Sequence, residues 1–370
     1  MSELMKIKTI YAEPGMIIGK DIYSSTDYLI AGEGTALTDR MISRLKFYSV
    51  EEIDIVTPDF LREKEQPVIP KKQAPVAGES YVNKVKASPE YKVFTETFST
   101  SYTSCKERFT NAIENNAPLN PDEMLADVTK IFTSCKNPSG LLDLMMTIRN
   151  LDDATYVHSV NVALICNLFA HWLKFNEKET RNLTLAGLLH DIGKLMIPAE
   201  IMQKPGKLTS EEYKVIQEHP LLGYNVLKNQ GVNYHVCMAA LMHHERCDGS
   251  GYPRGLTLNQ IDPYAKIVAI ADVYDALTSA RTYREPLSPL EVIGVFQTEG
   301  LRSYDPKYLM VFLDQIMYTY MNYTVQLSNG ETGRIVMMQK NHLDKPVIAL
   351  SGNRFIDLRE EKEITITGII

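Results

Sequence analysis

Residues 243–253 read His-His-Glu-Arg-Cys-Asp-Gly-Ser-Gly-Tyr-Pro, so two adjacent histidines and a carboxylate stand directly before a turn. Adjacent side chains on a helix point about 100° apart. His243 and His244 can therefore reach one cluster from two sides or serve two metal ions. Gly251 permits a positive φ, and Pro253 restricts the residue before it, which ends the helix and lays backbone across the mouth of a site. The stretch predicts a metal site whose other ligands come from elsewhere in the chain.

The candidate partners of this stretch form one ordered set of imidazoles and carboxylates. These donors suit iron, manganese or zinc. Asp191 follows an expected helix end, where its two oxygens could bridge two ions. His171, His235 and His342 have no motif around them, and we interpret them as structural. The set comprises His158, His190, Asp191, His219, His243, His244 and Asp272.

The bulk composition is that of a soluble globular protein, with 44% apolar and 23% charged residues among 370. The five cysteines are dispersed and form no CxxC pair, which is typical of reduced cytosolic thiols, so we expect a cytoplasmic protein. A net charge of −7 argues against a nucleic-acid polymer as partner. The apolar runs are too short for a membrane span, so no membrane partner is expected.

Changes in periodicity divide the chain into five segments. Helical patterning with short Gly/Pro joints dominates, and it gives way to period two before and after an Asn-Gly turn signal at 329–330. We therefore expect a mainly α protein: an all-α helical bundle with a small N-terminal α/β unit and a small C-terminal antiparallel β unit. The expected segments are 1–60 (α/β, regulatory or assembly), 61–80 (linker), 81–138 (helical connector), 139–321 (catalytic bundle) and 322–370 (β).

An aromatic seam marks the connector helix. Phe94, Phe98, Tyr102, Cys105 and Phe109 recur at spacings of three and four, which predicts one buried face. Packing within the chain is the first interpretation of this seam. A homodimer through residues 89–117 is the alternative.

The motifs together resemble the HD-GYP family, the metal-dependent phosphodiesterases of the bacterial messenger cyclic di-GMP within the HD-domain phosphohydrolases. The resemblance covers about residues 140–320. It is carried by His190-Asp191-Ile192-Gly193-Lys194, by the 243–253 stretch, and by Ala271-Asp272-Val273-Tyr274-Asp275 with the arginines that follow. Three motifs in the right order are far more specific than a lone His-Asp pair.

The resemblance implies an all-α HD-type bundle and a role for each matching residue. The seven residues of the imidazole and carboxylate set would bind non-haem iron or manganese. Lys194 would lie beside the scissile phosphate, with Asp191 as its catalytic neighbour. The substrate contacts would be Lys194, Asp275, Arg281, Arg284 and the Gly251-Tyr252-Pro253 turn, which would also offer a surface for signalling partners.

One departure from the family pattern bears on the number of ions. Three-metal members carry a glutamate four residues before the first histidine, and here that position is Ala154, which cannot ligate. Asp153 would project from nearly the opposite face of the helix. We therefore predict two metal ions per chain.

The expected reaction is hydrolysis of cyclic di-GMP to linear pGpG, with continuation to GMP left open. Two cations would activate a water and polarise a phosphate oxygen, while Lys194 would neutralise charge or protonate the leaving oxygen. Two alternatives remain: hydrolysis of another cyclic dinucleotide such as cyclic GMP-AMP, and a catalytically silent cyclic di-GMP receptor.

Overall fold

The computed structural model describes residues 4–9, 12–23, 29–38, 41–42, 45, 50, 52–56, 85–135, 138–148, 154–204, 206, 208–279, 287–339, 342–361 and 363–370. The chain divides into two compact units, residues 1–78 and 79–370. The second unit contains every residue of the predicted metal site.

The N-terminal unit is built on two short antiparallel strand pairs. β1 (Leu4–Lys8) pairs with β4 (Glu52–Val56), and β2 (Ile22–Tyr23) pairs with β3 (Leu29–Ala31). Ile53 and Ile55 alternate along β4 and enter a small core with Ile18 and Leu45, as expected for a strand with one buried face.

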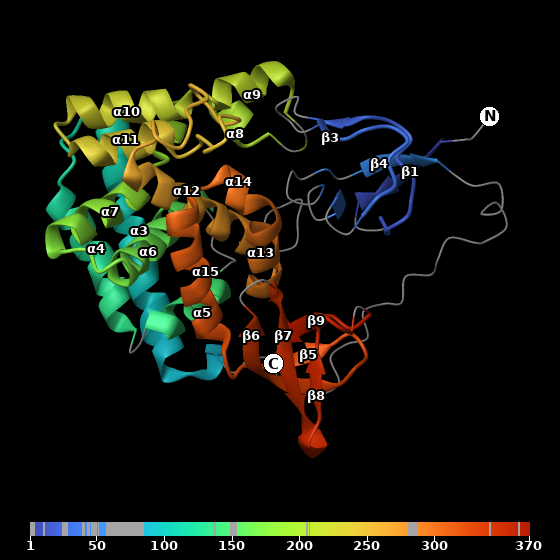
Figure 1. Cartoon of the computed structure of the whole chain (residues 1–370). Coiled ribbons are helices and arrows are strands. Elements are labelled where there is room, and N and C mark those ends of the chain that lie inside the picture. Colours follow the sequence, from blue (N-terminus) through green and yellow to red (C-terminus); the bar gives the residue numbers. More distant parts are fainter. Residues whose placement is uncertain are drawn as a thin grey trace. The chain divides into compact units, whose positions relative to one another are not determined.

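The second unit is a helical bundle followed by a sheet, so the predicted mainly α architecture is confirmed (Figure 1). Its helical elements are α3 (Pro89–Glu114), α4 (Pro121–Ser134), α5 (Pro138–Thr147), α6 (Ala154–Trp172), α7 (Glu177–Leu189), η3 (Ile192–Met196), α8 (Ala199–Met202), α9 (Ser210–Ile216), α10 (His219–Asn229), α11 (Tyr234–Met242), α12 (Pro263–Thr278), α13 (Pro289–Val295), η4 (Phe296–Gly300), α14 (Leu301–Ser303) and α15 (Pro306–Tyr320).

Local sequence chemistry sets where these helices begin. Pro follows the N-cap residue of α3, α4, α12, α13 and α15, where its missing N–H costs nothing. Capping boxes open three helices: Asn176 with Glu179, Thr209 with Glu212, and Ser288 with Glu291.

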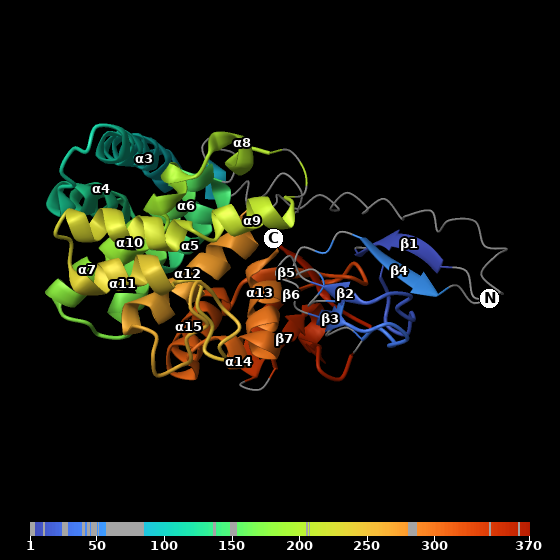
Figure 2. The same cartoon turned by 90° about the horizontal axis from the view of Figure 1, so that it is seen from above.

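Helices α6, α7, α11 and α12 pack against one another and form the centre of the bundle. α6 and α12 are mostly apolar and largely buried, and His158, Asn161, Asp272 and Asp275 are among the polar residues that interrupt them. Figure 2 shows α10 beside α11, on which it packs. A largely apolar helix belongs inside a bundle, so these four polar side chains are candidates for site residues.

The aromatic seam on α3 is covered within the chain. Phe94 and Phe98 are fully buried, Cys105 and Phe109 nearly so, and α3 packs on α4 and α6. These side chains therefore pack within the chain, which was the first interpretation of the seam.

A five-stranded antiparallel sheet follows α15, in the order β8-β7-β6-β5-β9. The strands are β5 (Thr324–Leu327), β6 (Thr332–Gln339), β7 (His342–Leu350), β8 (Phe355–Asp357) and β9 (Ile366–Ile369). The Tyr323 hydroxyl donates to Asp143 Oδ2 on α5 at 2.6 Å, and Gln297 Oε1 of η4 accepts from the Leu343 N–H of β7 at 2.7 Å. The side chains of Tyr323 and Gln297 thus link the sheet region to the bundle.

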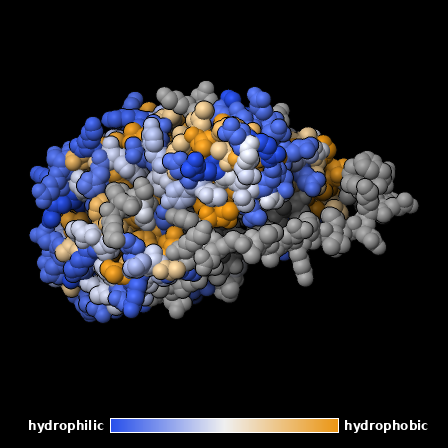
Figure 3. All heavy atoms as spheres, turned by 90° about the horizontal axis from the view of Figure 1, so that it is seen from below, coloured by the Kyte–Doolittle hydropathy of each residue, from blue (hydrophilic) through white to orange (hydrophobic). Residues whose placement is uncertain are grey.

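Among the described residues, no helix combines the length and apolar character needed to cross a bilayer. Hydrophilic residues dominate the face shown in Figure 3, with smaller apolar patches between them.

Candidate metal centre

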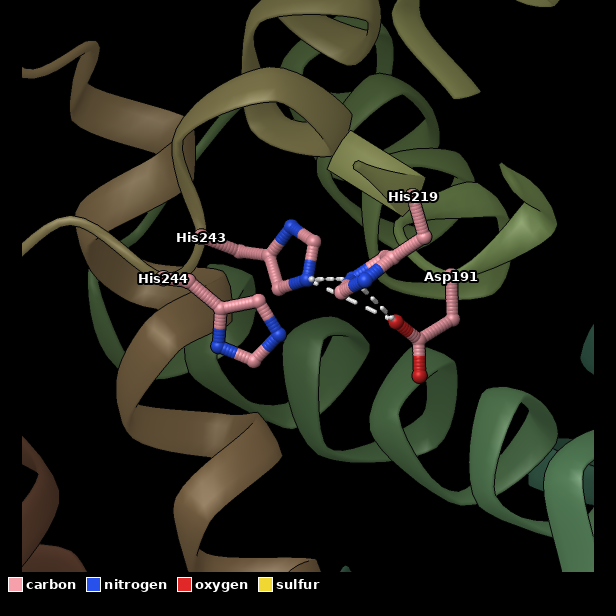
Figure 4. A group of neighbouring side chains, drawn as sticks. All are labelled: Asp191, His219, His243 and His244. Atoms are coloured by element: carbon pink, nitrogen blue, oxygen red, sulfur yellow. Dashed lines mark hydrogen bonds and ion pairs between the residues drawn. The ribbon is translucent and has the colours of Figure 1, made fainter. Parts of the chain in front are cut away.

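Asp191 stands at the junction of two clusters of donor atoms. In the first, one atom each from Asp191, His219, His243 and His244 lies within 4.8 Å of every other. Asp191 Oδ1 is 3.2 Å from His219 Nε2 and 3.5 Å from His243 Nε2, and those two nitrogens are 3.2 Å apart. Figure 4 shows these four side chains pointing toward one another.

The second cluster holds His158, His190 and Asp272, again with donor atoms within 4.8 Å of one another. His158 Nε2 lies 3.1 Å from Asp272 Oδ1. The other oxygen of Asp191, Oδ2, is 3.3 Å from His190 Nε2 and 3.7 Å from His158 Nε2. One carboxylate therefore faces both clusters, with one oxygen toward each.

The ends of helices bring these residues together. His190 caps the C-terminus of α7 and Asp191 follows it; His219 opens α10; His243 caps α11. His158 and Asp272 come instead from the interiors of α6 and α12. The site thus lies where three helix termini meet two buried helices.

Glycine at position 193 allows η3 to lie directly against α10. A Cβ there would overlap the His219 carbonyl oxygen and come within 2.6 Å of the Gly223 nitrogen. This close approach sets His219 beside Asp191, which gives the glycine of the His-Asp-Ile-Gly-Lys motif a packing role.

Backbone carbonyls hold three of the imidazoles in one tautomer. The Nδ1 atoms of His190, His219 and His243 lie 2.8, 2.7 and 3.0 Å from the carbonyl oxygens of Gly187, Ile216 and Ala240. A carbonyl can only accept, so Nδ1 carries the hydrogen and Nε2 presents its lone pair to the cluster.

Two of the inward-facing atoms have no hydrogen-bond partner within the described part of the chain. They are His190 Nε2 and Asp191 Oδ1, both buried. Lone pairs that face one another in a buried site are costly unless a cation lies between them. The residues therefore fit metal ions, and the histidine and carboxylate donors suit borderline-hard ones.

The pKa shifts of His243 and Asp191 fit the protonation states of metal ligands, whereas in His158 the effect of burial is outweighed by hydrogen bonds to Asp272 and Asp275, which raise the pKa to about 9. Burial, together with neighbouring imidazoles, lowers the pKa of His243 to about 4, against a weaker opposing effect of Asp191. Burial alone would raise the pKa of Asp191, but His190 and Lys194 outweigh it and hold the pKa well below the usual range. His243 is thus neutral and Asp191 ionised near pH 7, as ligation requires.

Lys194 is the cation at the edge of this centre. Its Nζ lies 2.5 Å from Asp191 Oδ2, and about a fifth of its side chain is exposed, 22%. An ammonium group that contacts the shared carboxylate and also reaches solvent is well placed to meet an anionic ligand.

The turn at 251–253 packs over the first cluster. The Tyr252 ring stacks on the His244 ring with centroids 4.6 Å apart, and the backbone N–H of Tyr252 donates to the His244 carbonyl at 3.2 Å. A Cβ on Gly251 would overlap the backbone of residues 244–246. Pro253 is exposed. The turn therefore lies at the surface of the site, with tyrosine as its contact to the histidines.

Glu245 has a role that the sequence alone did not reveal. Its buried carboxylate accepts from the Arg254 N–H through Oε1 and from the Leu256 N–H through Oε2, both at 2.8 Å. It thus ties the turn to the end of α11 and stays outside both donor clusters. Its position next to the two histidines gave no local sign of this, because the backbone donors lie nine and eleven residues away.

Asp275 also differs from its expected surroundings. It is buried, with Oδ2 2.7 Å from His158 Nδ1 and Oδ1 accepting from Asn161 Nδ2 at 2.9 Å. We expected it to contact substrate, whereas its carboxylate faces a histidine of the second cluster from behind. The other expected substrate contacts, Arg281 and Arg284, lie outside the described residues, as does Asp153. Ala154 is the first residue of α6.

Comparison with known proteins agrees with this geometry. Residues 143–308 match the family model described as HD domain. The resemblance to the HD-GYP branch is confirmed by curated relatives and by a solved structure with the same fold.

Two curated relatives and one solved structure illustrate the match. A cyclic di-GMP phosphodiesterase of Pseudomonas aeruginosa is 35% identical over 61% of this chain and 53% of its own length. A 3′3′-cGAMP-specific phosphodiesterase of Vibrio cholerae is 44% identical over 46% of this chain and 41% of its own. The chain thus spans about half the length of these relatives. An HD-GYP-type protein of Bdellovibrio bacteriovorus, 19% identical, has a TM-score of 0.50 over 85% of this chain and 99% of its own.

Proposed function

We propose that the protein is a metal-dependent phosphodiesterase that hydrolyses cyclic di-GMP to linear pGpG, with further hydrolysis to GMP as an extension of the same chemistry. The observation that carries the proposal is the shared Asp191 carboxylate, whose two oxygens face two separate clusters of donors. Two cations held by these two sets of residues would suit displacement at phosphorus. The Pseudomonas aeruginosa relative, which is named for this substrate, supports the choice of ligand.

The proposed centre takes two ions per chain, with iron or manganese as the metals that suit its donors. Asp191, His219, His243 and His244 would hold one ion, and His158, His190 and Asp272 with Asp191 the other. Bound ions supply positive charge that polarises a phosphate oxygen and favours deprotonation of the attacking water. Ala154 cannot donate, so no third ion is proposed.

The chain's own residues orient the substrate and handle its charge. Lys194, at the edge of the centre, would neutralise the developing charge on the phosphate or give a proton from Nζ to the leaving 3′-oxygen. Tyr252 would line the cleft beside His244, and Gly251 and Pro253 would shape it. Arg281 and Arg284 would bind phosphate or a guanine edge with their planar forks.

A second candidate substrate is 3′3′-cyclic GMP-AMP. The relative from Vibrio cholerae that is specific for it is 44% identical to this chain, more than the cyclic di-GMP relative, although over a shorter stretch. Hydrolysis rates of cyclic di-GMP, 3′3′-cyclic GMP-AMP and cyclic di-AMP, measured on one preparation, would rank the candidates.

The deciding experiment pairs metal analysis with turnover on the same anaerobically purified sample. We expect two ions per chain and conversion of cyclic di-GMP to pGpG. The double variant His190→Ala/Asp191→Ala should lose both metal and hydrolysis. A reproducible three ions would refute the two-metal centre. Binding of cyclic di-GMP without turnover in the iron- or manganese-loaded protein would favour the silent receptor instead.

Partners and location follow from the same proposal. A cytoplasmic bacterial enzyme would meet its soluble messenger directly, and the Gly251-Tyr252-Pro253 surface would contact signalling proteins. A homodimer through residues 89–117 stays a prediction, and it would have to use faces of that helix other than the covered seam. Light scattering of the full chain measures the oligomeric state.

A further inference from the structure

Two pairs of polar residues face each other between the buried helices α6 and α12. His158 and Asn161 stand three residues apart on α6, and Asp272 and Asp275 stand three apart on α12, so each pair shares one helical face. The two helices pack together. His158 meets Asp272 through Nε2 at 3.1 Å and Asp275 through Nδ1 at 2.7 Å.

Asp275 is held from a second side. Its Oδ1 accepts from Asn161 Nδ2 at 2.9 Å and from Ser279 Oγ at 3.3 Å. A carboxylate only accepts, so the atom of Asn161 that faces it is the amide nitrogen, and the atom of His158 that faces it carries a hydrogen. With Asn161 occupying Oδ1, Oδ2 is the oxygen left for the histidine.

We propose that Asp275, oriented by Asn161, is a positioning residue that keeps the hydrogen of His158 on Nδ1 and leaves Nε2 as the donor to a cation. In His190, His219 and His243, backbone carbonyls keep the hydrogen on Nδ1 in the same way. His158 lies inside α6, where the carbonyls of the preceding turn accept hydrogen bonds within the helix. The acceptor for the hydrogen on Nδ1 of His158 is therefore a side chain. A carboxylate behind a metal-binding histidine is a recurrent arrangement that also fixes the ring.

The inference rests on the proposed metal centre. It assigns Asp275 the orientation of His158, which is a more specific role than substrate contact. In Asp275→Asn, the amide oxygen would stay with the Asn161 donor, and the amide nitrogen would turn to His158. It would donate to Nδ1 and force the hydrogen of the ring onto Nε2, which then cannot ligate. The substitution is isosteric, so packing is retained.

The chain also offers a rescue. In Asn161→Asp/Asp275→Asn, the new carboxylate at 161 accepts from the amide nitrogen at 275. The amide oxygen then faces His158 again and accepts from Nδ1. The pair keeps its total charge and volume, and only the donor and acceptor ends are exchanged.

The test is Mn²⁺ titration of the chelator-stripped full chain, with occupancy and Kd read by electron paramagnetic resonance. We expect Asp275→Asn to weaken binding of one Mn²⁺ equivalent by about 10- to 100-fold, and the double exchange to return Kd to near the parent value. Asn161→Ala, which leaves both oxygens of Asp275 in place, should fall between parent and Asp275→Asn. Asp127→Asn removes another buried carboxylate, on α4, and should leave Mn²⁺ binding unchanged.

Parent-like Mn²⁺ binding by Asp275→Asn would overturn the inference, and so would a double variant no better than the single one. If Asp275→Asn fails to fold, the Kd for Mn²⁺ is compared among the parent, the double variant and Asn161→Ala. The inference then requires the double variant to bind Mn²⁺ nearly as tightly as the parent and Asn161→Ala to bind it more weakly. A parent chain that binds Mn²⁺ but hydrolyses no cyclic dinucleotide would refute the proposed function alone. A parent that binds no Mn²⁺ would refute both.

Discussion

Gly193 lies so close to His219 that a Cβ at 193 would overlap the carbonyl oxygen of the histidine. The short helix η3 and the start of α10 are therefore in direct backbone contact. This contact sets the first imidazole of α10 3.2 Å from the Asp191 carboxylate.

Gly193→Ala should separate η3 from α10 and disrupt the first donor cluster. We expect a loss of ~1–3 kcal/mol in the free energy of unfolding, the usual cost of an overpacked site, together with reduced metal content. Urea denaturation and metal analysis measure the two effects. Gly368→Ala is the matched control, because a Cβ there has nothing within 4 Å. Equal stability of the two variants would contradict the close approach.

Lys194→Met should slow hydrolysis without emptying the centre. The side chain keeps its apolar length but loses the ammonium group next to Asp191 Oδ2, so we expect kcat to fall ~10²–10³-fold, as for loss of one charge-stabilising donor. Metal content should stay at the parent level. Lys214→Met, at an exposed position on α9, is the control and should keep full activity. A large fall in metal content with unchanged kcat per bound ion would argue that Lys194 serves structure alone.

Glu245→Gln should loosen the turn that carries Tyr252. Glutamine has a single oxygen, so either the Arg254 or the Leu256 N–H would face an amide NH₂ group and stay unsatisfied. We expect about 1–3 kcal/mol of lost stability and a raised KM, because Tyr252 would no longer be held over His244. Glu211→Gln, exposed on α9, controls for loss of a carboxylate. The prediction fails if both variants match the parent in urea midpoint and KM.

Alkaline conditions should destabilise the fold through Cys105. Burial, with a smaller effect of Asp127, raises the pKa of this thiol from 9.0 to about 12. A group with a raised folded-state pKa contributes stability that is present below its unfolded value, so the free energy of unfolding should fall as pH rises from about 9 towards 12. Urea midpoints under reducing conditions from pH 8 to 10.5 measure the slope. In Cys105→Ala the slope of the urea midpoint against pH should be smaller. An unchanged slope would show that this thiol does not cause the loss of stability.

Much of the architecture was predictable from periodicity. The helical block, the connector helix with its aromatic seam and the change to strands after residue 320 all follow from local patterns of apolar residues and turn signals, and the mainly α fold is confirmed. The seven expected donor residues do lie in two adjacent clusters. Their motifs are local, so the types of donor and their order along the chain are visible in the sequence.

Which atom faces which is a different matter, and only the tertiary structure decided it. The contact between His158 and Asp275 joins residues 117 positions apart. Glu245 accepts hydrogen bonds from the backbone N–H groups of Arg254 and Leu256, beyond the turn. A sequence shows that carboxylates stand near histidines, but hydrogen bonds depend on distance and direction. Packing of α6 on α12 and of η3 on α10 determined that Asp191 faces both clusters, while Asp275 and Glu245 lie behind them.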